Sequence, residues 1–346
     1  MKYADYIIVG DGYAALFFAH QLLKNGKSFL LFSEGKKSAS QVSAGIINPV
    51  VLKKFTSFWL AQEQIDTLKQ TLAEIADYTG KNYLIEQNIH RILHNEDEKN
   101  LWLKKSQNED LKHFLSTDFK QVEGVQNPFG CGKVEQSARL DVSGFFRDML
   151  QYLDQNQYLI KERFDYEKLN ALDNHYGDIS FSHIVFAEGI GVKNNPFFSQ
   201  IPIHPNKGHH IKVKLEQKLP LTLKKKHFLF PFSDDLYYYG GTYDRQSTDE
   251  TIDETAILQL KNGLEEFYPS SYEITEECVG FRPTVKDRRP ILGQHREHSN
   301  LYVFNGLGAR GILNASYFSD LLFQYIEHRK PLPEEVLLSR FEAPTH

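Results

Sequence analysis

The opening of the chain constrains its fold more than any other stretch of the sequence. Residues 5–24 read DYIIVGDGYAALFFAHQLLK, an apolar β-type run followed by a glycine turn and a stretch with helical periodicity. A second apolar run, from Ser28 to Phe32, follows the turn at Asn25-Gly26. This order predicts a βαβ unit with residues 10–15 at its first strand-to-helix turn.

That turn reads Gly10-Asp11-Gly12-Tyr13-Ala14-Ala15, the spacing GxGxxG with alanine in the last position. Gly10 permits the tight turn, Gly12 lets a pyrophosphate approach the backbone, and Ala15 lets the helix lie close to the strand. The first amides of the helix are then free to bind phosphate. The motif alone is weak evidence, but its place between a strand and a helix is the context that dinucleotide binding requires.

An acidic residue that binds the ribose is expected about 20 residues further on, at the tip of the second strand. The tip position holds Ser33, and Glu34 follows it. Because side chains alternate across a strand, Glu34 can serve only if the strand has already ended. We favour Glu34 for the ribose, with Ser33 as the alternative through a weaker neutral hydrogen bond.

Composition narrows the class of protein. The chain has 346 residues, of which 41% are hydrophobic and 25% charged, which is typical of a globular protein of about two domains. A net charge of −5 provides no general attraction for DNA. Two cysteines cannot form a disulfide framework, and no apolar run is long enough to span a membrane. We therefore expect a cytoplasmic protein without a transmembrane segment. The pair His90 and His94 lacks a third ligand nearby, so no metal site is predicted.

The later part of the chain predicts a second, mainly antiparallel region inserted into the α/β one. Residues 200–280 contain short β-like runs such as HHIKVKL, HFLFPF, DLYYYGGTY and EECVGFRP, with a helix at Ile252–Tyr268. The chain then returns to a strand, a glycine turn at Gly306–Gly311 and a helix at Ile312–His328. No second strand follows that helix, so this second GxGxxG cannot complete a βαβ unit. We interpret it as closing on the first cofactor.

These motifs together resemble a known family, the FAD-dependent amine and amino-acid oxidoreductases of the D-amino-acid oxidase type, particularly glycine and sarcosine oxidases. The resemblance rests on DYIIVGDGYAA, SAGIINP, ARLDV, VFAEGIG, YYYGGTY, GFRPTVKDRRPILG and LYVFNGLGARG. It runs nearly end to end and is loosest over residues 55–135. The tail, GLGARGILNASYFSDLLFQYIEHRKPLP, is also similar to the flavin domain of the bifunctional enzymes that mature 5-methylaminomethyl-2-thiouridine in tRNA.

The resemblance implies an α/β fold: a Rossmann-like FAD-binding domain with an inserted, mainly antiparallel β-sheet substrate domain (α+β). The FAD-binding domain is expected to be discontinuous, formed by residues 1–50, 138–205 and 282–346. Residues 51–137 and 206–281 are then expected to form the substrate-binding domain.

The resemblance also implies where FAD would bind. The diphosphate would lie at the first glycine turn, the ribityl chain and flavin ring along Ser40–Ile47, and the pyrimidine edge at Gly306–Gly311. The full set of implied cofactor contacts is Gly10, Gly12, Ala14, Ala15, Ser33, Glu34, Ser40, Gln41, Ala44, Gly45, Ile47, Ala187, Gly189, Gly306, Gly308, Ala309, Arg310, Gly311 and Ile312. In sarcosine oxidases with covalent flavin, the linking cysteine aligns nearer Gly280, whereas Cys278 lies two residues earlier. Noncovalent FAD is therefore expected.

For the reaction, the resemblance implies oxidation of a C–N bond by hydride transfer to flavin N5, followed by hydrolysis of the imine. Arg282 matches the family arginine that holds the substrate carboxylate through a two-pronged salt bridge. Arg310 is a candidate second anion contact, and Tyr243 and His210 are candidates to line the pocket. For each of these, packing or a surface role is the alternative.

The sequence leaves two other functions open. A tRNA wobble-uridine modification that removes a carboxymethyl group would use the same chemistry, because its substrate is itself an N-substituted glycine. The acidic net charge and the lack of a fused methyltransferase count against it. A flavin-binding module without turnover is the other possibility. The electron acceptor, whether oxygen or another carrier, and the oligomeric state also stay open.

Overall fold

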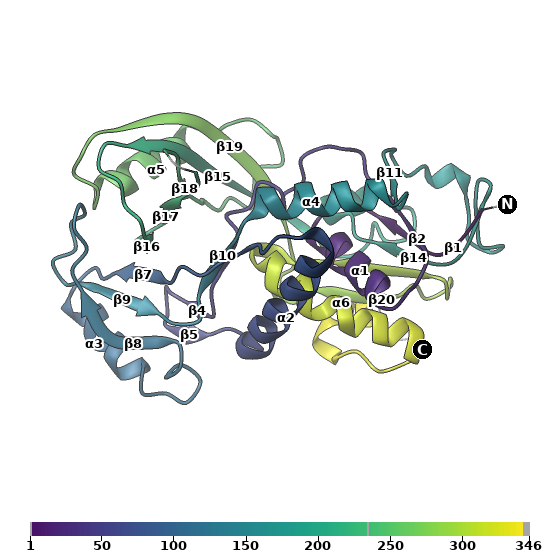
Figure 1. The fold of residues 1–346 in the computed structure, drawn as a ribbon, viewed down its shortest axis with the longest axis horizontal. Helices are drawn as coiled ribbons and strands as arrows, with labels where there is room; N and C mark the ends of the chain where they lie inside the picture. Colours follow the sequence, from purple (N-terminus) through teal and green to yellow (C-terminus); the bar gives the residue numbers. More distant parts are fainter. Residues whose placement is uncertain (1, 234, 342–346) are drawn as a thin grey trace.

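The structure is a computed structural model that describes residues 2–233 and 235–341. It has two lobes side by side, seen right and left in Figure 1. The right-hand lobe holds the N-terminal strand and the last helix. The left-hand lobe is dominated by two long paired strands, β15 (His204–Leu215) and β19 (Tyr272–Thr284). Each lobe is built around its own sheet, which gives the mixed α/β and antiparallel architecture expected from the sequence.

The first sheet is mainly parallel and centres on β1 (Lys2–Val9). This strand pairs with β2 (Phe29–Phe32) on one side and with β14 (Ile179–Phe186) on the other, and β14 pairs in parallel with β21 (Leu301–Asn305). The sheet also includes β11 (Leu159–Ile160), β12 (Leu169–Asn170), β13 (His175–Tyr176) and β20 (Ile291–Gln294). Both β2 and β21 are buried throughout, and their sequences are accordingly apolar except for the last residue of β21, Asn305.

Helices cover the first sheet and bury an apolar core against it. They are α1 (Tyr13–Lys24), α2 (Ala61–Thr79), α4 (Val142–Gln155) and α6 (Gly311–His328). The crossover helix α1 packs against α6, and their buried side chains form one cluster with β1 and β21. Figure 1 shows α1, α4 and α6 together on one side of the right-hand lobe. The opposite side of the sheet has a second apolar cluster that includes Phe164, Phe186 and Phe198.

The second sheet has the strand order β19-β15-β18-β17-β16-β7-β9-β8. Its pairs are antiparallel except for β16 with β7. The strands not yet bounded are β7 (Ile89–Ile92), β8 (Leu115–Lys120), β9 (Cys131–Val134), β16 (Thr222–Lys224), β17 (Phe228–Pro231) and β18 (Tyr237–Gly240). Helix α5 (Glu254–Glu265) packs on β15 and β18.

The two faces of this second sheet differ in chemistry. Side chains alternate between the faces of a strand, and Ile211, Val213 and Tyr239 belong to the apolar cluster that α5 covers. The neighbouring positions, such as His210 and Tyr238, therefore point to the opposite face. We call that opposite face the open face. The loop that follows β2 contacts it, because an ideal β-carbon on Gly280 would lie 2.8 Å from Val42 Cγ2.

The remaining elements are smaller. One three-stranded sheet contains β3 (Ile46–Ile47), β10 (Ala138–Leu140) and β6 (Leu84–Ile85), and a two-stranded one contains β4 (Val50–Val51) and β5 (Thr56–Ser57). Helix α3 (Glu96–Lys105) packs beside β8. Short 3-10 turns are η1 (Tyr166–Lys168), η2 (Gly189–Asn194), η3 (Gly308–Arg310), η4 (Glu334–Val336) and η5 (Leu338–Phe341).

We propose to divide the chain as the sequence suggests, into an FAD-binding domain around the first sheet and a substrate-binding domain around the second. Strands of the first sheet come from residues 2–32, 159–186 and 291–305, and those of the second from 89–134 and 204–284. The long strands β15 and β19 extend across the proposed boundaries and join the domains directly.

One helix differs from its sequence prediction. The helix expected at Ile252–Tyr268 is shorter at both ends, spanning Glu254–Glu265. Its start is set by Asp253, whose side chain accepts a hydrogen bond of 2.8 Å from the backbone N–H of Thr255. The hydrophobic residues beyond its end, Phe267 and Tyr268, are buried by the second core rather than by a continuing helix.

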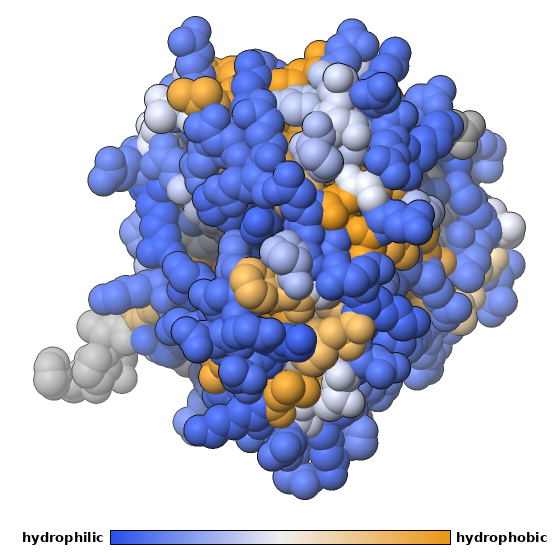
Figure 2. Space-filling model, turned by 90° about the vertical axis from the view of Figure 1, so that its left-hand side faces the viewer, coloured by the Kyte–Doolittle hydropathy of each residue, from blue (hydrophilic) through white to orange (hydrophobic). Residues whose placement is uncertain are grey.

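The surface of the left-hand lobe is mainly hydrophilic. Figure 2 views this end directly and shows apolar patches separated by hydrophilic residues. Among the helices of residues 2–233 and 235–341, none combines the length and the apolar character that a membrane crossing requires.

Candidate active site

The first glycine turn joins the carboxyl end of β1 to α1 with little room to spare. Gly10 has φ of +115°, and an ideal β-carbon there would lie 2.5 Å from the carbonyl oxygen of Ala187 at the end of β14. Only glycine avoids both the strained conformation and this collision. Ala14 and Ala15 are buried in the core beneath the turn. The turn therefore fixes α1 directly over the ends of two parallel strands, where ligands bind in open α/β sheets.

The N-terminus of α1 is free for an anion. Its N-cap residue is Gly12, which has no side chain to cap the helix, and no acidic residue occupies its first turn. The hydroxyl of Ser40 accepts a hydrogen bond of 3.2 Å from the backbone N–H of Tyr13, which brings the following loop over this helix end. The amides of the first helical turn and the positive end of the helix dipole suit a phosphate group.

The candidate ribose residues lie just beyond β2, which ends at Phe32. Ser33 is buried and its hydroxyl donates a hydrogen bond of 2.6 Å to Asp11. Glu34 is 40% exposed and lies 2.9 Å from Lys36 and 3.5 Å from Arg163. Because the strand has ended, Glu34 meets the condition that its proposed role requires, while the Ser33 hydroxyl is committed to Asp11.

Sequence reasoning missed a second acid at this edge. Glu188 follows the end of β14 and accepts hydrogen bonds from the Tyr166 hydroxyl and, at 2.7 Å, from Asn195 Nδ2. Burial raises the pKa of the Glu188 carboxyl. It lies inside the motif VFAEGIG, but only the fold shows that Tyr166 and Asn195 hold it in place.

The remaining predicted cofactor residues lie in three turns or in the elements that adjoin them. In the first, Gln41 Oε1 accepts a hydrogen bond of 2.9 Å from Ser38, and Leu140 N–H donates one of 2.8 Å to the Gly45 carbonyl. The other two turns, containing Gly189 and Gly306, are tied together because Asn305 Nδ2 donates to the Gly189 carbonyl at 2.9 Å. The predicted residues in the turns are Ser40, Gln41, Ala44, Gly45, Ala187, Gly189, Gly306, Gly308, Ala309 and Arg310, whereas Ile47 lies in β3 and Gly311 and Ile312 begin α6.

Helix α6 begins in the same way as α1. Its N-cap position is Arg310, without a side-chain cap and with no acidic residue in the first turn. Two helices that pack together thus present uncapped N-termini beside the carboxyl ends of β1 and β21. A group with negative charge at two separated places, such as a dinucleotide with a diphosphate and a polar ring edge, fits these residues.

The position corresponding to a flavin-linking cysteine has no space for a side chain. An ideal β-carbon on Gly280 would lie 2.8 Å from Val42 Cγ2. Cys278 points to the same face of β19, but its thiol donates a hydrogen bond of 3.1 Å to Glu276. Burial, together with Glu276, raises the pKa of this thiol to about 12, so it stays protonated. Noncovalent attachment remains our prediction for FAD.

The open face of the second sheet carries a row of stacked rings. The ring of His210 stacks on Tyr238 with centroids 4.5 Å apart, and Tyr238 stacks on Phe230 at 4.8 Å. The Arg139 guanidinium lies 4.3 Å from the centre of the Phe230 ring and ends the row. Burial, followed by the charge of Lys212, lowers the pKa of His210 to about 4, so the imidazole is neutral near pH 7. The three rings form an uncharged wall beside Arg282, and the Arg139 cation lies at the far end of it.

Arg282 lies at the edge of this wall and is half-buried. Its Nη1 donates a hydrogen bond of 3.1 Å to the Thr242 carbonyl, and its guanidinium carbon lies 4.5 Å from the centre of the Tyr243 ring. Tyr243 itself is 67% exposed. Among the described residues, Arg282 forms no ion pair with a carboxylate. A guanidinium held by a carbonyl and an aromatic ring keeps donors for an anionic ligand.

Arg310 is more enclosed than Arg282. Its Nη2 donates a hydrogen bond of 3.0 Å to the Asn48 carbonyl, and the guanidinium packs on the ring of Phe58. Burial lowers its pKa well below the usual range, and the nearby charge of Arg289 lowers it further. Like Arg282, it has no carboxylate partner within the part of the chain that the structure describes.

Two residues of the open face gave no signal in the sequence. Asn206 is directly opposite Arg282 in the register of β15 and β19, is 3% exposed, and its Oδ1 has no hydrogen-bond partner. Gly208 lies next along the same face, opposite Gly280. Both could have been found only from the pairing of two strands about 70 residues apart in the chain.

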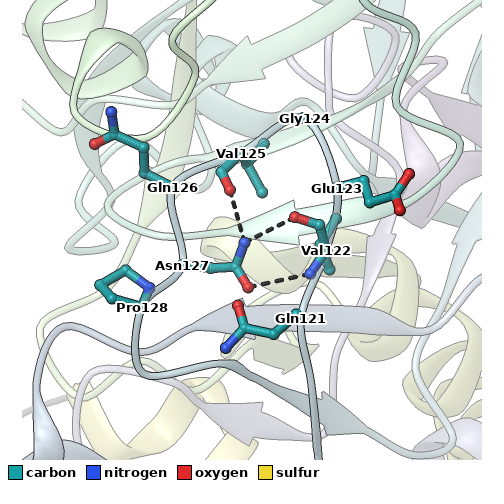
Figure 3. A pocket seen from close by; sticks show the side chains of 8 residues that line it. All are labelled: Gln121, Val122, Glu123, Gly124, Val125, Gln126, Asn127 and Pro128. Atoms are coloured by element: carbon teal, nitrogen blue, oxygen red, sulfur yellow. Dashed lines mark hydrogen bonds between the residues drawn. The ribbon is translucent and has the colours of Figure 1, made fainter.

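One surface hollow is not part of this site. It has a volume of about 510 Å³ and is lined entirely by one loop, residues 121–128 (Figure 3). The side chain of Asn127 fills its hydrogen-bonding capacity inside the loop, accepting from Val122 N–H at 3.1 Å and donating to the carbonyls of Val122 and Val125. The described residues also contain no cluster of side chains suited to a metal ion.

Fold and site together define a dinucleotide-binding protein with a second, ligand-facing sheet. The sequence model of the FAD dependent oxidoreductase family matches residues 5–324, and the chain belongs to that family. FAD is accordingly its cofactor, and the uncapped helix ends and close backbone turns described above fit this group.

Similar proteins support the same family. The chain is 29% identical over 158 residues to the tRNA 5-methylaminomethyl-2-thiouridine biosynthesis bifunctional protein MnmC of Idiomarina loihiensis, covering 41% of the chain and 25% of the relative. It is 25% identical over 163 residues to glycine oxidase of Bacillus subtilis, covering 44% and 43%. The matches thus span less than half of these relatives. The solved structure of glycine oxidase from Geobacillus kaustophilus superposes with a TM-score of 0.81 at 18% identity, covering 100% of both chains.

Proposed function

We propose that the protein oxidises the C–N bond of a small amino acid or secondary amine that bears a carboxylate. One observation supports this most strongly: Arg282 stands at the edge of a neutral aromatic wall with no carboxylate partner among the described residues. The substrate carboxylate would supply the missing counter-charge. Bound FAD would supply the hydride acceptor for the carbon next to nitrogen.

The residues of the chain contribute binding and orientation. Arg282 would hold the carboxylate through two parallel hydrogen bonds, which fixes the adjacent carbon as well as the charge. His210 is uncharged near neutral pH because burial lowers its pKa, so it adds no second cation that would compete for the carboxylate. The uncapped N-terminus of α6 would stabilise negative charge at the nearby edge of the flavin.

The names of the relatives fit this substrate class. Glycine oxidase of Bacillus subtilis is one curated relative, and an iminodiacetate oxidase from Chelativorans sp. BNC1 is a structural neighbour with a TM-score of 0.76. Both names describe amino acids whose nitrogen lies one carbon from a carboxylate.

Replacing Arg282 tests the proposal. Removing one partner of a desolvated charge pair typically costs about 2–5 kcal/mol of binding free energy. Arg282→Met should therefore lower the affinity for a carboxylate substrate by at least about thirtyfold. Arg282→Lys should restore only part of the loss, because an ammonium cannot make the planar two-pronged contact. The measurement is anaerobic flavin reduction against concentration of N-methylglycine, with N-methylethylamine as the substrate that lacks a carboxylate.

The exposed Arg296 provides the matched control, since Arg296→Met removes an arginine from the surface. Bound FAD and its spectrum should be unchanged in all variants. If Arg282→Met reacts normally with the carboxylate substrate, or loses affinity for the plain amine to the same extent, Arg282 is structural and the proposed substrate class is wrong.

A second candidate function is the modification of a wobble uridine in tRNA. The similarity to MnmC favours it, and a carboxymethylaminomethyl group is itself an N-substituted glycine that Arg282 would hold in the same way. Reduction of the flavin by the modified nucleoside or tRNA, but not by free amino acids, would select this candidate over the first.

A further inference from the structure

The Arg282 side chain does not stay above its own strand. It starts on β19 at the edge of the second sheet, and its Nη1 donates to the carbonyl of Thr242, which follows β18. Strand β15 lies between β19 and β18 in the sheet. The side chain therefore crosses over β15 to reach its partner.

The crossing occurs where β15 has no side chain on the open face. Three alternate residues of this strand point to that face, Asn206, Gly208 and His210, since they oppose Arg282, Gly280 and Cys278 of β19. The flanking two are buried, at 3% and 7% exposure. Gly208 thus leaves a gap between an amide and an imidazole, and the guanidinium lies in it.

The fit of the guanidinium in this gap is tight. An ideal β-carbon on Gly208 would collide with Nη1 of Arg282 and would stand 2.6 Å from Nη2 and 2.8 Å from Cζ. On the far side, an ideal β-carbon on Gly241 would stand 2.9 Å from the same Nη2. Real β-carbons essentially never approach other atoms this closely, so the guanidinium position requires glycine at 208.

We propose that Gly208, assisted by Gly241, is a positioning residue that sets where Arg282 presents its charge to a substrate carboxylate. This inference rests on the proposed function. The inference adds that affinity for the carboxylate depends on the absence of a side chain at position 208 of β15. Gly208 itself donates no group to the ligand.

The displaced atoms make this role separable from folding. Glycine in a strand interior weakens the strand relative to alanine, so Gly208→Ala does not oppose the backbone conformation. The atoms that it would meet are the far end of a flexible side chain. The guanidinium should therefore move while the sheet keeps its register.

A double-mutant cycle between Gly208 and Arg282 tests the proposal. Gly208→Ala should lower the affinity for N-methylglycine by at least about tenfold, the equivalent of ~1.4 kcal/mol. It should leave the affinity for N-methylethylamine unchanged. In the Arg282→Met background, adding Gly208→Ala should change nothing further, because the group that it displaces is gone. Acetate, a carboxylate that cannot be oxidised, should show the same pattern when its binding is followed by the change in flavin absorbance.

Gly177→Ala is the control for glycine replacement as such. Gly177 has φ of +56° and open space around its β-carbon position, so alanine there is strained but distant from the open face. It should lower the melting temperature without changing acetate binding. Gly241→Ala should reproduce the effect of Gly208→Ala in smaller measure, and it serves as the second variant if the first does not fold.

Normal acetate binding by both glycine variants would overturn the inference, and so would an undiminished effect of Gly208→Ala in the Arg282→Met background. These results differ from a failure of the proposed function, which would appear already in Arg282→Met alone.

Discussion

The two ligand-facing regions of this molecule are built in opposite ways. At the cofactor edge, Gly10, Gly12 and Ala15 act within a few residues of one another, and α1 carries the result. On the open face, Arg282 obtains its position from Gly208 and Thr242, which lie 74 and 40 residues earlier in the chain. A local motif therefore specifies the first region, whereas the second depends on the register of three strands. Mutations at the two regions should have separable effects.

The largest expected effect concerns the cofactor region alone. Gly12→Leu places a side chain where the diphosphate must approach the backbone, and even its β-carbon would lie 3.0 Å from Ser40 Oγ. The purified variant should contain essentially no FAD, measured by absorbance near 450 nm after equilibration with excess cofactor. Circular dichroism should still show the folded protein. Gly177→Ala is the control and should be fully yellow, while full FAD content in Gly12→Leu would contradict the assignment of this turn.

A smaller effect should come from His210 on the open face, which should make the free energy of unfolding depend on pH. Burial lowers the folded-state pKa of His210 to about 4, against about 6.5 in the unfolded chain. Between these values the unfolded state binds more protons, so stability should fall as pH decreases from 6.5 to 4. His210 would contribute roughly 3 kcal/mol of that loss, at about 1.36 kcal/mol per pKa unit.

The groups that act on His210 are Lys212, Arg282 and His209, which lower its pKa further, and Glu276, which opposes them. Replacing His210 with glutamine should flatten the stability profile by this amount, as measured by urea unfolding at several pH values. His113, which is exposed, provides the control through His113→Gln. Parallel profiles for wild type and His210→Gln would show that the imidazole is not buried as described.

The smallest expected effect contrasts two buried asparagines. Asn127 satisfies its amide within its own loop, whereas Asn206 on the open face has an Oδ1 without a partner. Losing the bonds of Asn127 through Asn127→Leu should destabilise the protein by about 1–3 kcal/mol, while Asn206→Leu should stabilise the FAD-free protein by about 1 kcal/mol. Thermal unfolding of the two variants checks the predicted loss of stability in Asn127→Leu and the predicted gain in Asn206→Leu. Destabilisation of similar size at both positions would mean that Asn206 is satisfied in solution.

The sequence predicts the first region better than the second for a physical reason. The turn at residues 10–15 and the strand–turn–helix at 301–328 are local, so the sequence predicts their structure. For the first turn, its place between a strand and a helix also indicates a dinucleotide. For Ser33 and Glu34, the sequence leaves a choice that depends on where β2 stops. In the structure, β2 stops at Phe32. Arg282 was identifiable through its resemblance to a family motif. Gly208, Asn206 and Tyr238 were not, because nothing local shows which residues lie opposite them.

Anaerobic reduction of the bound flavin tests the central claim most directly. The substrates are glycine, N-methylglycine, D-alanine and a carboxymethylaminomethyl uridine, each compared with the same amine lacking its carboxylate. The account predicts bleaching by at least one carboxylate compound at concentrations where its carboxylate-free partner leaves the flavin oxidised. Equal bleaching by both members of every pair, or bleaching only by amines without a carboxylate, would contradict it.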